Sequence, residues 1–132
     1  MGVSMVEKKP VRISGSEWEV MEVLWKGSPD GLLLGQVVES LPAGKTWATK
    51  TIQTFLKRLT DKGAVEAMRE GRMLRYSAAV SHADCVENEA GSFLERVFDG
   101  RVSSLVAHFL SDDRLDEAEV EELSRMLEER RG

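Results

Sequence analysis

The spacing of apolar residues changes once along this 132-residue chain, and that change limits the folds it can adopt. Residues 64–70 and 72–80 flank Gly71 with partly alternating apolar side chains, which predicts two short antiparallel strands joined by a tight turn at Glu70 and Gly71. Elsewhere the apolar residues recur every three or four positions, as on one face of a helix. The predicted order is three helices, a β-hairpin and three further helices: a mainly α fold with one small β-hairpin.

The first three helices are defined by their ends and their apolar faces. Ser14 stands three residues before Glu17, which is the spacing of a capping box at the start of a helix. The second helix closes at 42–44, the third covers about 48–62, and residues 1–12 are expected to form a loose arm. The predicted apolar faces are Trp18, Met21, Leu24 and Trp25; Leu34, Val37, Val38 and Leu41; and Ile52, Phe55, Leu56 and Leu59.

Three helices followed by a hairpin is the plan of a winged helix-turn-helix domain, which we assign to residues 11–80. Residues 81–130 are expected to form a helical dimerisation domain. Three amphipathic helices in a segment of about 50 residues cannot enclose a good core alone, so their apolar stripes need a partner surface. The predicted dimer interface consists of Phe93, Leu94, Val97, Leu105, Val106, Phe109, Leu110, Leu123 and Leu127.

The charge of the chain is divided unequally between its two halves. Residues 1–80 carry 12 Lys and Arg against 9 acidic residues, whereas residues 81–132 carry 6 Arg against 14 acidic residues. The overall net charge of -5 therefore conceals a basic N-terminal half. Such a half is expected to meet a polyanion, while the acidic half stays clear of it.

Composition excludes several classes of protein and site. No apolar run approaches the roughly 18 residues of a membrane span, so we expect a cytoplasmic protein without direct membrane association. Cys85 is the only cysteine, which excludes an intrachain disulfide and a multi-cysteine zinc site. His82 and Glu89 could join Cys85 in a metal or redox site, but a lone cysteine is usually a small apolar residue, and we expect no metal or other cofactor. No constellation typical of an enzyme is present.

The polar face of the third helix carries residues suited to a DNA groove. Lys and Arg neutralise phosphates, and Thr can bond to base edges or touch a thymine methyl. Because the N-terminal part of a recognition helix reaches the bases, Lys50, Thr51 and Thr54 are predicted to contact bases, and Lys57 and Arg58 to contact phosphates. The remaining predicted DNA-binding residues are Trp47 and Thr49 at the helix start and Arg69, Arg72, Arg75 and Tyr76 in the hairpin.

Two alternatives remain open for these residues. Trp47 either packs under the start of the third helix or contacts the DNA backbone. The polar face itself could be an ordinary solvated surface, or it could dock an acidic protein partner in a winged-helix interaction module that does not read DNA sequence. The coincidence of helix order, a basic wing and few acidic residues favours double-stranded DNA.

Several segments resemble the penicillinase-repressor family, the BlaI/MecI/CopY type of bacterial regulator. They are ISGSEWEVMEVLW (13–25), TWATKTIQTFLKRLTDKGAV (46–65) and EGRMLRYSAAVS (70–81). The stretch SLVAHFLSDDRLDEAEVEELSRML (104–127) is similar to the C-terminal dimerisation helices of that family. The resemblance covers about residues 11–130 and implies a homodimeric winged-helix repressor of palindromic operators.

The resemblance also bears on how such a repressor is released. In the β-lactamase-sensing branch, a membrane sensor with a metalloprotease domain triggers cleavage between Asn and Phe in a dimerisation helix. The matching bond here joins His108 and Phe109, with His in place of Asn. The copper-responsive branch uses C-terminal Cys-x-Cys pairs, and this chain has no cysteine after Cys85. Where the family often has Ser-Pro, this chain has Ala48-Thr49.

Overall fold

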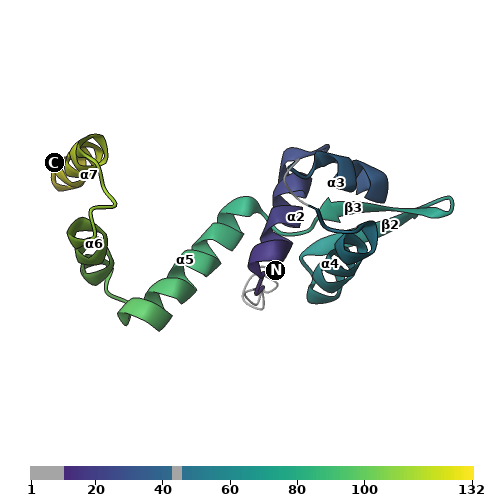
Figure 1. The fold of residues 1–132 in the computed structure, drawn as a ribbon, viewed down its shortest axis with the longest axis horizontal. Helices are drawn as coiled ribbons and strands as arrows, with labels where there is room; N and C mark the ends of the chain where they lie inside the picture. Colours follow the sequence, from purple (N-terminus) through teal and green to yellow (C-terminus); the bar gives the residue numbers. More distant parts are fainter. Residues whose placement is uncertain (1–10, 43–45) are drawn as a thin grey trace, which may run out of the picture. The chain divides into compact units, whose positions relative to one another are not determined.

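The computed structural model of the chain describes residues 11–42 and 46–132 (Figure 1). The expected loose arm therefore lies outside the described residues except for its last two, and so do two of the three residues expected to close the second helix. The elements are α2 (Gly15–Lys26), β1 (Leu32–Leu33), α3 (Leu34–Ser40), α4 (Thr49–Lys62), β2 (Val65–Glu70), β3 (Met73–Ala78), α5 (His82–Phe98), α6 (Val102–Ser111) and α7 (Glu117–Arg131). The predicted order of helices and hairpin is confirmed.

The chain divides into two compact units, residues 1–89 and 90–132. The boundary lies inside α5, whereas the sequence divided the chain at Ser81. The first turns of α5 belong to the N-terminal unit because Cys85 is buried there and the ring of His82 lies 4.8 Å from that of Trp25. The indole nitrogen of Trp25 also donates a hydrogen bond of 2.9 Å to the carbonyl of Val80, just before α5.

The sheet contains one strand more than the sequence indicated. The hairpin strands β2 and β3 pair antiparallel, and the two turn residues are Gly71, with φ of 64°, and Arg72. The two-residue strand β1 pairs with the edge of β3 that faces away from β2, so the strand order is β1-β3-β2. The sequence does not predict β1, because its two residues, Leu32 and Leu33, are too few to show an alternating pattern.

The core of the N-terminal unit lies between α2, α3, α4 and the sheet (Figure 1). Helix α4 buries Ile52, Leu56 and Leu59 of its predicted stripe, and α2 buries Met21 and Leu24 of its own together with Val20 and Val23, which the predicted stripe did not include. Trp18 and Trp25 are half-buried and pack against this core, as expected. The largest fully buried side chains are Met21, Ile52, Leu56, Leu59, Val20 and Val37.

A buried carboxylate joins the start of α2 to the end of α4. The predicted capping box is present: Ser14 and Glu17 exchange side-chain and backbone hydrogen bonds of 3.0 and 3.2 Å. Glu17 is 3% exposed, and its Oε1 also accepts a 2.5 Å bond from Lys62 Nζ. Burial alone would raise the pKa of Glu17, but the bonds from Lys62 and Ser14 outweigh it, so the pKa lies below its ordinary 4.5.

This lowered pKa predicts an acid-sensitive contribution to stability. A carboxylate favoured in the native state stabilises the protein above its unfolded-state pKa, and the contribution is lost as the pH falls through the lower folded value. Glu17→Gln is expected to reduce the free energy of unfolding near neutral pH by about 1.5–3 kcal/mol, the range for a hydrogen bond to a charged group. It should also flatten the loss of stability on acidification.

Denaturant unfolding of both proteins near neutral pH and below the ordinary glutamate pKa measures the two effects. Glu66→Gln, at an exposed carboxylate on β2, is the matched control and should leave both nearly unchanged. If Glu17→Gln lost stability on acidification as steeply as the wild type, other carboxylates would be responsible.

The C-terminal unit consists of the rest of α5 with α6 and α7. Among residues 90–132, all of which the structure describes, no residue is buried. Large apolar side chains instead remain open, with Val97 52% and Leu127 67% exposed. In the described residues, no helix is long and apolar enough to cross a membrane.

Candidate nucleic-acid interface

Helix α4 turns a polar face to solvent and an apolar face to the core. Ile52, Leu56 and Leu59 are buried, and the period of 3.6 residues places the polar side chains opposite them. Thr51 is half-buried at the edge of the polar face. The exposed residues of this polar face are Thr49, Lys50, Gln53, Thr54, Lys57, Arg58 and Asp61, while the exposed Lys62 at the helix end binds Glu17.

Three of these exposed side chains make contacts within the helix. Thr54 Oγ1 donates a 3.1 Å bond to the carbonyl of Lys50, which leaves the hydroxyl oxygen able to accept another bond. Lys57 lies 3.3 Å from Asp61, with 77% and 66% of the two side chains exposed. So exposed an ion pair contributes little, and Lys57 can exchange Asp61 for another anion.

Trp47 lies just before α4 and packs beside it. Its ring is 5.1 Å from that of Phe55 at 73°, and both residues lie against the core. This contact favours the packing role among the two that the sequence left open. Ala48 occupies the N-cap position of α4 and supplies no side-chain cap, because alanine has no polar side-chain atom.

The four hairpin residues expected at the interface fall into two groups. Arg69 and Arg72 are exposed, with Arg72 in the turn itself. Tyr76 is only 7% exposed and belongs to the core, and Arg75 is bound within the protein. The geometry therefore does not favour Arg75 and Tyr76 as direct DNA contacts, because their side chains are occupied in holding the fold.

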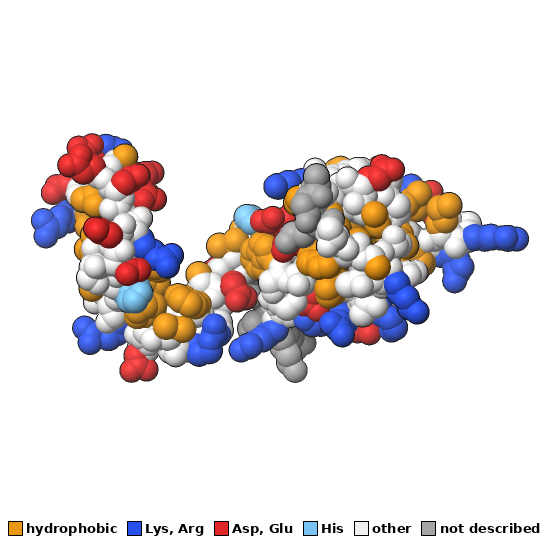
Figure 2. Space-filling view, viewed as in Figure 1, with side chains coloured by type: hydrophobic (Ala, Val, Ile, Leu, Met, Phe, Trp, Pro, Cys, Tyr) orange, Lys and Arg blue, Asp and Glu red, His pale blue; other side chains and the backbone are white. Residues whose placement is uncertain are grey.

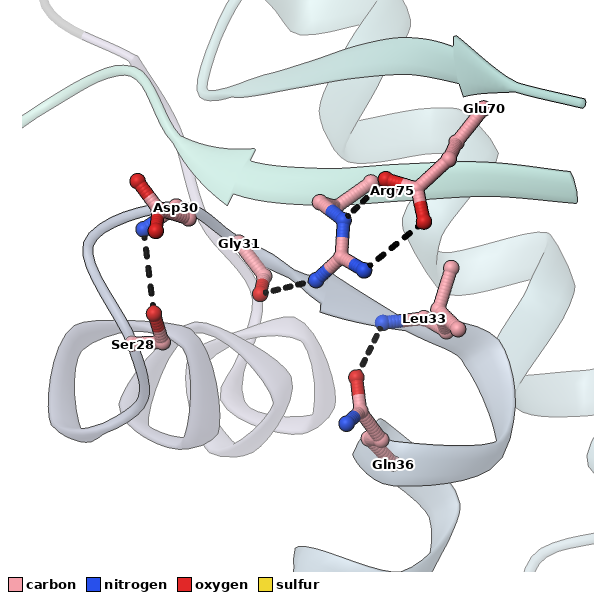
Figure 3. A network of polar contacts seen from close by, with 7 residues as sticks. All are labelled: Ser28, Asp30, Gly31, Leu33, Gln36, Glu70 and Arg75. Atoms are coloured by element: carbon pink, nitrogen blue, oxygen red, sulfur yellow. Dashed lines mark hydrogen bonds and ion pairs between the residues drawn. The ribbon is translucent and has the colours of Figure 1, made fainter.

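Arg75 forms the centre of a polar network at the base of the hairpin (Figure 3). Its Nε and one terminal nitrogen donate bonds of 2.8 and 3.0 Å to the two carboxylate oxygens of Glu70. Its other terminal nitrogen donates a 3.0 Å bond to the carbonyl of Gly31. The hydrogen bonding between Arg75 and Glu70 lowers the pKa of Glu70 and raises that of Arg75, so both side chains stay charged.

Two open grooves border the polar face of α4 on its hairpin side. One, of about 410 Å³, lies between α4 and the hairpin and is lined in part by Lys50, Gln53, Thr54 and Lys57. A second, of about 580 Å³, is lined by residues from the start of α3 and by Gln53 and Arg72. Gln53 was absent from the predicted site, although its place on the polar face was visible in the sequence.

Positive charge gathers on this side of the N-terminal unit. In Figure 2, Lys and Arg side chains follow the lower edge of the unit, around α4, and mark the end of the hairpin. Within α4 the one acidic side chain is Asp61. A concave surface that combines cations with hydroxyl and amide groups suits a nucleic-acid backbone and its base edges.

Comparison with known proteins assigns the chain to a family. A family model described as penicillinase repressor matches residues 13–129. The chain belongs to the penicillinase-repressor family. It is 40% identical to the penicillinase repressor of Bacillus licheniformis, over 95% of this chain and 96% of the relative. It is 30% identical to the methicillin resistance regulatory protein MecI of Staphylococcus aureus strain N315, over 92% of this chain and 98% of the relative.

A solved structure resembles part of this penicillinase-repressor family member. The solution structure of the DNA binding domain of the repressor BlaI matches with a TM-score of 0.51 and 40% identity, covering 58% of this chain and 92% of that one. The family is one of transcriptional repressors and not of enzymes. The expected family and fold class are therefore confirmed.

The residues predicted for dimerisation lie in the C-terminal unit, which has no buried core of its own. Leu94, Leu105, Val106, Phe109 and Leu123 are half-buried. The more exposed members are Phe93 at 37%, Val97 at 52%, Leu110 at 50% and Leu127 at 67%. None of them is buried within the chain itself.

Cys85, the one cysteine of this family member, lies in the core at 3% exposure. Burial raises the pKa of its thiol, with a smaller effect from Asp84 and Glu89, so the unreactive protonated form is favoured. Over residues 11–42 and 46–132, no group of three or more His, Cys, Asp and Glu side chains could hold a metal ion. The packing role is the one that the geometry favours.

Proposed function

We propose that this protein is a cytoplasmic, sequence-specific DNA-binding transcriptional repressor that acts as a homodimer on a palindromic operator. The observation that carries the proposal is the exposed face of α4, where cations, hydroxyls and an amide border a groove beside the hairpin. The family membership and the DNA-binding role of the similar BlaI domain support the same function. Blocking polymerase access to the occupied duplex is the resulting mode of repression.

The proposed interface divides base reading from phosphate binding. Lys50, Thr51, Gln53 and Thr54 lie in the first half of α4, the part of a recognition helix that reaches base edges. Thr49 lies at its first turn, and Trp47 supports the helix start. The residues proposed to neutralise phosphates are Lys57, Arg58, Arg69 and Arg72.

The second protomer is proposed to cover the C-terminal unit. Its three helices leave their apolar stripes uncovered, and a second copy would bury the predicted stripe from Phe93 to Leu127. A two-fold dimer would then present two α4 helices to half-sites about 34–36 Å apart, one helical turn of DNA. The division expected from the sequence, 11–80 for DNA binding and 81–130 for dimerisation, is proposed here with its boundary moved to Glu89, because the first turns of α5 pack with the N-terminal unit.

We propose that induction occurs by cleavage of the bond between His108 and Phe109, triggered by a membrane-bound sensor with a metalloprotease domain. The bond lies inside α6, and the His108 carbonyl accepts a 3.2 Å bond from the Asp112 amide. Because proteases act on extended chain, α6 must unwind locally before cleavage. Incubating the purified chain with the sensor protease and locating the new termini by mass spectrometry tests this bond, and cleavage elsewhere would contradict it.

Binding of the upstream region of the protein's own gene tests the proposed function. A palindromic fragment should be retained at moderate salt, with affinity that falls steeply as salt rises because phosphate contacts release counterions. Arg72→Ala should weaken specific and random duplexes alike and reduce the salt slope by about one. Gln53→Ala should cost about 1–3 kcal/mol on the operator alone if the amide reads a base.

Arg114→Ala, at an exposed arginine of the C-terminal unit, is the control and should change neither affinity nor slope. If the wild-type chain retained no duplex but bound an acidic protein through α4, the alternative of a winged-helix interaction module would replace this proposal. Equal losses on operator and random DNA for Gln53→Ala would remove Gln53 from base reading.

A further inference from the structure

The hairpin is supported unevenly along its length. Strand β1 pairs with β3 only at Tyr76 and Arg75, so β3 has two neighbours at its base. Beyond Arg75, toward the turn, β3 pairs with β2 alone. A two-stranded ribbon without a third strand is marginally stable and twists readily. The tip that carries Arg72 is thus the least constrained part of the proposed interface.

Arg75 lies at the last position that β1 supports, on the face of the hairpin turned away from α4. Leu74 and Tyr76 line the groove beside α4, and alternation along a strand places Arg75 on the opposite face, beside Met68. Its side chain is 26% exposed and is bound to Glu70 and to Gly31. These contacts aim the guanidinium away from the groove proposed to hold DNA.

The two hydrogen-bond acceptors of Arg75 lie on either side of it: one next to β1, at the base of the hairpin, and the other beside the turn, where β1 does not reach (Figure 3). Gly31 precedes β1, while Glu70 is the last residue of β2 before the turn. Gly31 has φ of 99°, and a β-carbon there would lie 2.8 Å from the Tyr76 carbonyl oxygen and 3.0 Å from Arg75 Cγ. Glycine therefore permits the close approach that brings its carbonyl to Arg75.

We propose that Arg75 is a positioning residue, whose bridge from Gly31 to Glu70 fixes the hairpin tip so that Arg72 and α4 engage one duplex together. The inference rests on the proposed function and deepens it. A hairpin tip that is already fixed before binding loses little conformational entropy on contact with DNA. The smaller entropic cost strengthens binding. Arg75 itself touches no phosphate in this arrangement.

Glu70 provides a test in which charge and positioning predict opposite results. If electrostatics alone acted, Glu70→Gln would tighten binding, because it removes an acid beside a phosphate-binding arginine. If the bridge positions the tip, Glu70→Gln weakens binding despite the favourable change of charge. Arg75→Lys keeps the charge but cannot bond to both carboxylate oxygens and to Gly31 with one planar group.

The experiment measures binding of the full chain to its upstream palindromic duplex over a range of salt. Arg75→Lys and Glu70→Gln are each expected to lower affinity about five- to tenfold, the cost of one newly mobile segment, with the salt slope of the wild type. Glu66→Gln, which removes an exposed carboxylate from β2 without touching the bridge, is the matched control and should stay within about twofold of the wild type. Thermal unfolding verifies that every variant is folded.

Three results would overturn the proposal. They are tighter binding by Glu70→Gln, wild-type affinity in Arg75→Lys together with a reduced salt slope in Arg75→Ala, and unchanged affinity in all of these variants. The second would make Arg75 a direct phosphate ligand. The third would limit it to folding stability.

Hydrogen exchange without DNA separates this inference from the proposed function. Amides of residues 68–74 should exchange about tenfold faster in Arg75→Lys and Glu70→Gln, while those of α4 stay as in the wild type. If the wild-type chain bound no duplex, the proposed function would fail, and the positioning role with it, whatever the exchange rates. Unchanged exchange at the tip would overturn the bridge even if the chain bound its operator.

Discussion

Truncation after Glu89 is expected to give a folded monomer that binds the operator at least 100-fold more weakly than the full chain. All of the buried core lies before this point, so the remaining unit keeps its packing. The loss follows from removing the second half-site contact, because linked binding can raise affinity by about 10²–10⁴ over a single module. Size-exclusion chromatography with light scattering measures the assembly, and fluorescence anisotropy measures the affinity.

The position of the cut matters for this experiment. A cut at Val80 would remove Cys85, which is buried in the N-terminal unit, and the ring of His82 against Trp25. Its effect on DNA binding would then be mixed with a loss of stability. Ending the chain at Glu89 avoids this.

Point variants in the full chain separate loss of dimerisation from loss of the segment itself. Leu105→Asp places a charge in the predicted interface and should reproduce the monomer and its weak binding. Ser103→Asp, at an exposed position on the same helix, is the matched control and should remain dimeric. A truncated chain that bound the operator as tightly as the full one would refute the proposed division between the units.

Leu56→Ala is expected to lower the free energy of unfolding by about 2–5 kcal/mol, a large share of the 5–15 kcal/mol that holds a typical domain together. Leu56 is fully buried in α4, and truncating it leaves a cavity against α2 and the sheet. Denaturant unfolding measures the change. At a temperature where the variant is still folded, the operator affinity per folded molecule should fall far less than the stability does.

Lys57→Ala is the matched control because it alters the adjacent position on the opposite face of the same helix. Its side chain is 77% exposed, so stability should change by no more than about 0.5 kcal/mol. Operator affinity and its salt slope should fall instead. If both variants changed stability and binding in the same ratio, the division of α4 into a core face and a DNA face would be wrong.

Much of the fold was predictable because it depends on local patterns. The capping box of Ser14 and Glu17, the apolar stripe of α4 and the glycine at the hairpin turn are each set by a few neighbouring residues. The family resemblance, now confirmed over residues 13–129, gave the same fold class. Strand β1 was missed because its two residues adopt an extended form only by pairing with β3.

The candidate site was predictable only in part. The exposed face of α4 follows from its period, so the sequence predicted that Lys50, Thr54 and Lys57 lie on the exposed side of the helix. It could not separate Arg72 from Arg75, since both are arginines in one basic hairpin. Only the fold brings Arg75 to Gly31, 44 positions earlier in the chain.

The sequence alone determined the order of helices and hairpin, the two faces of α4 and the separation of basic and acidic halves, because each depends on residue type and short-range spacing. The tertiary structure decided which polar groups are available and which are occupied: it drew Tyr76 into the core and Arg75 into a bridge, and it exposed Gln53 beside a groove. The physical reason is that a hydrogen bond or a buried contact needs a partner from elsewhere in the chain, and only folding supplies it.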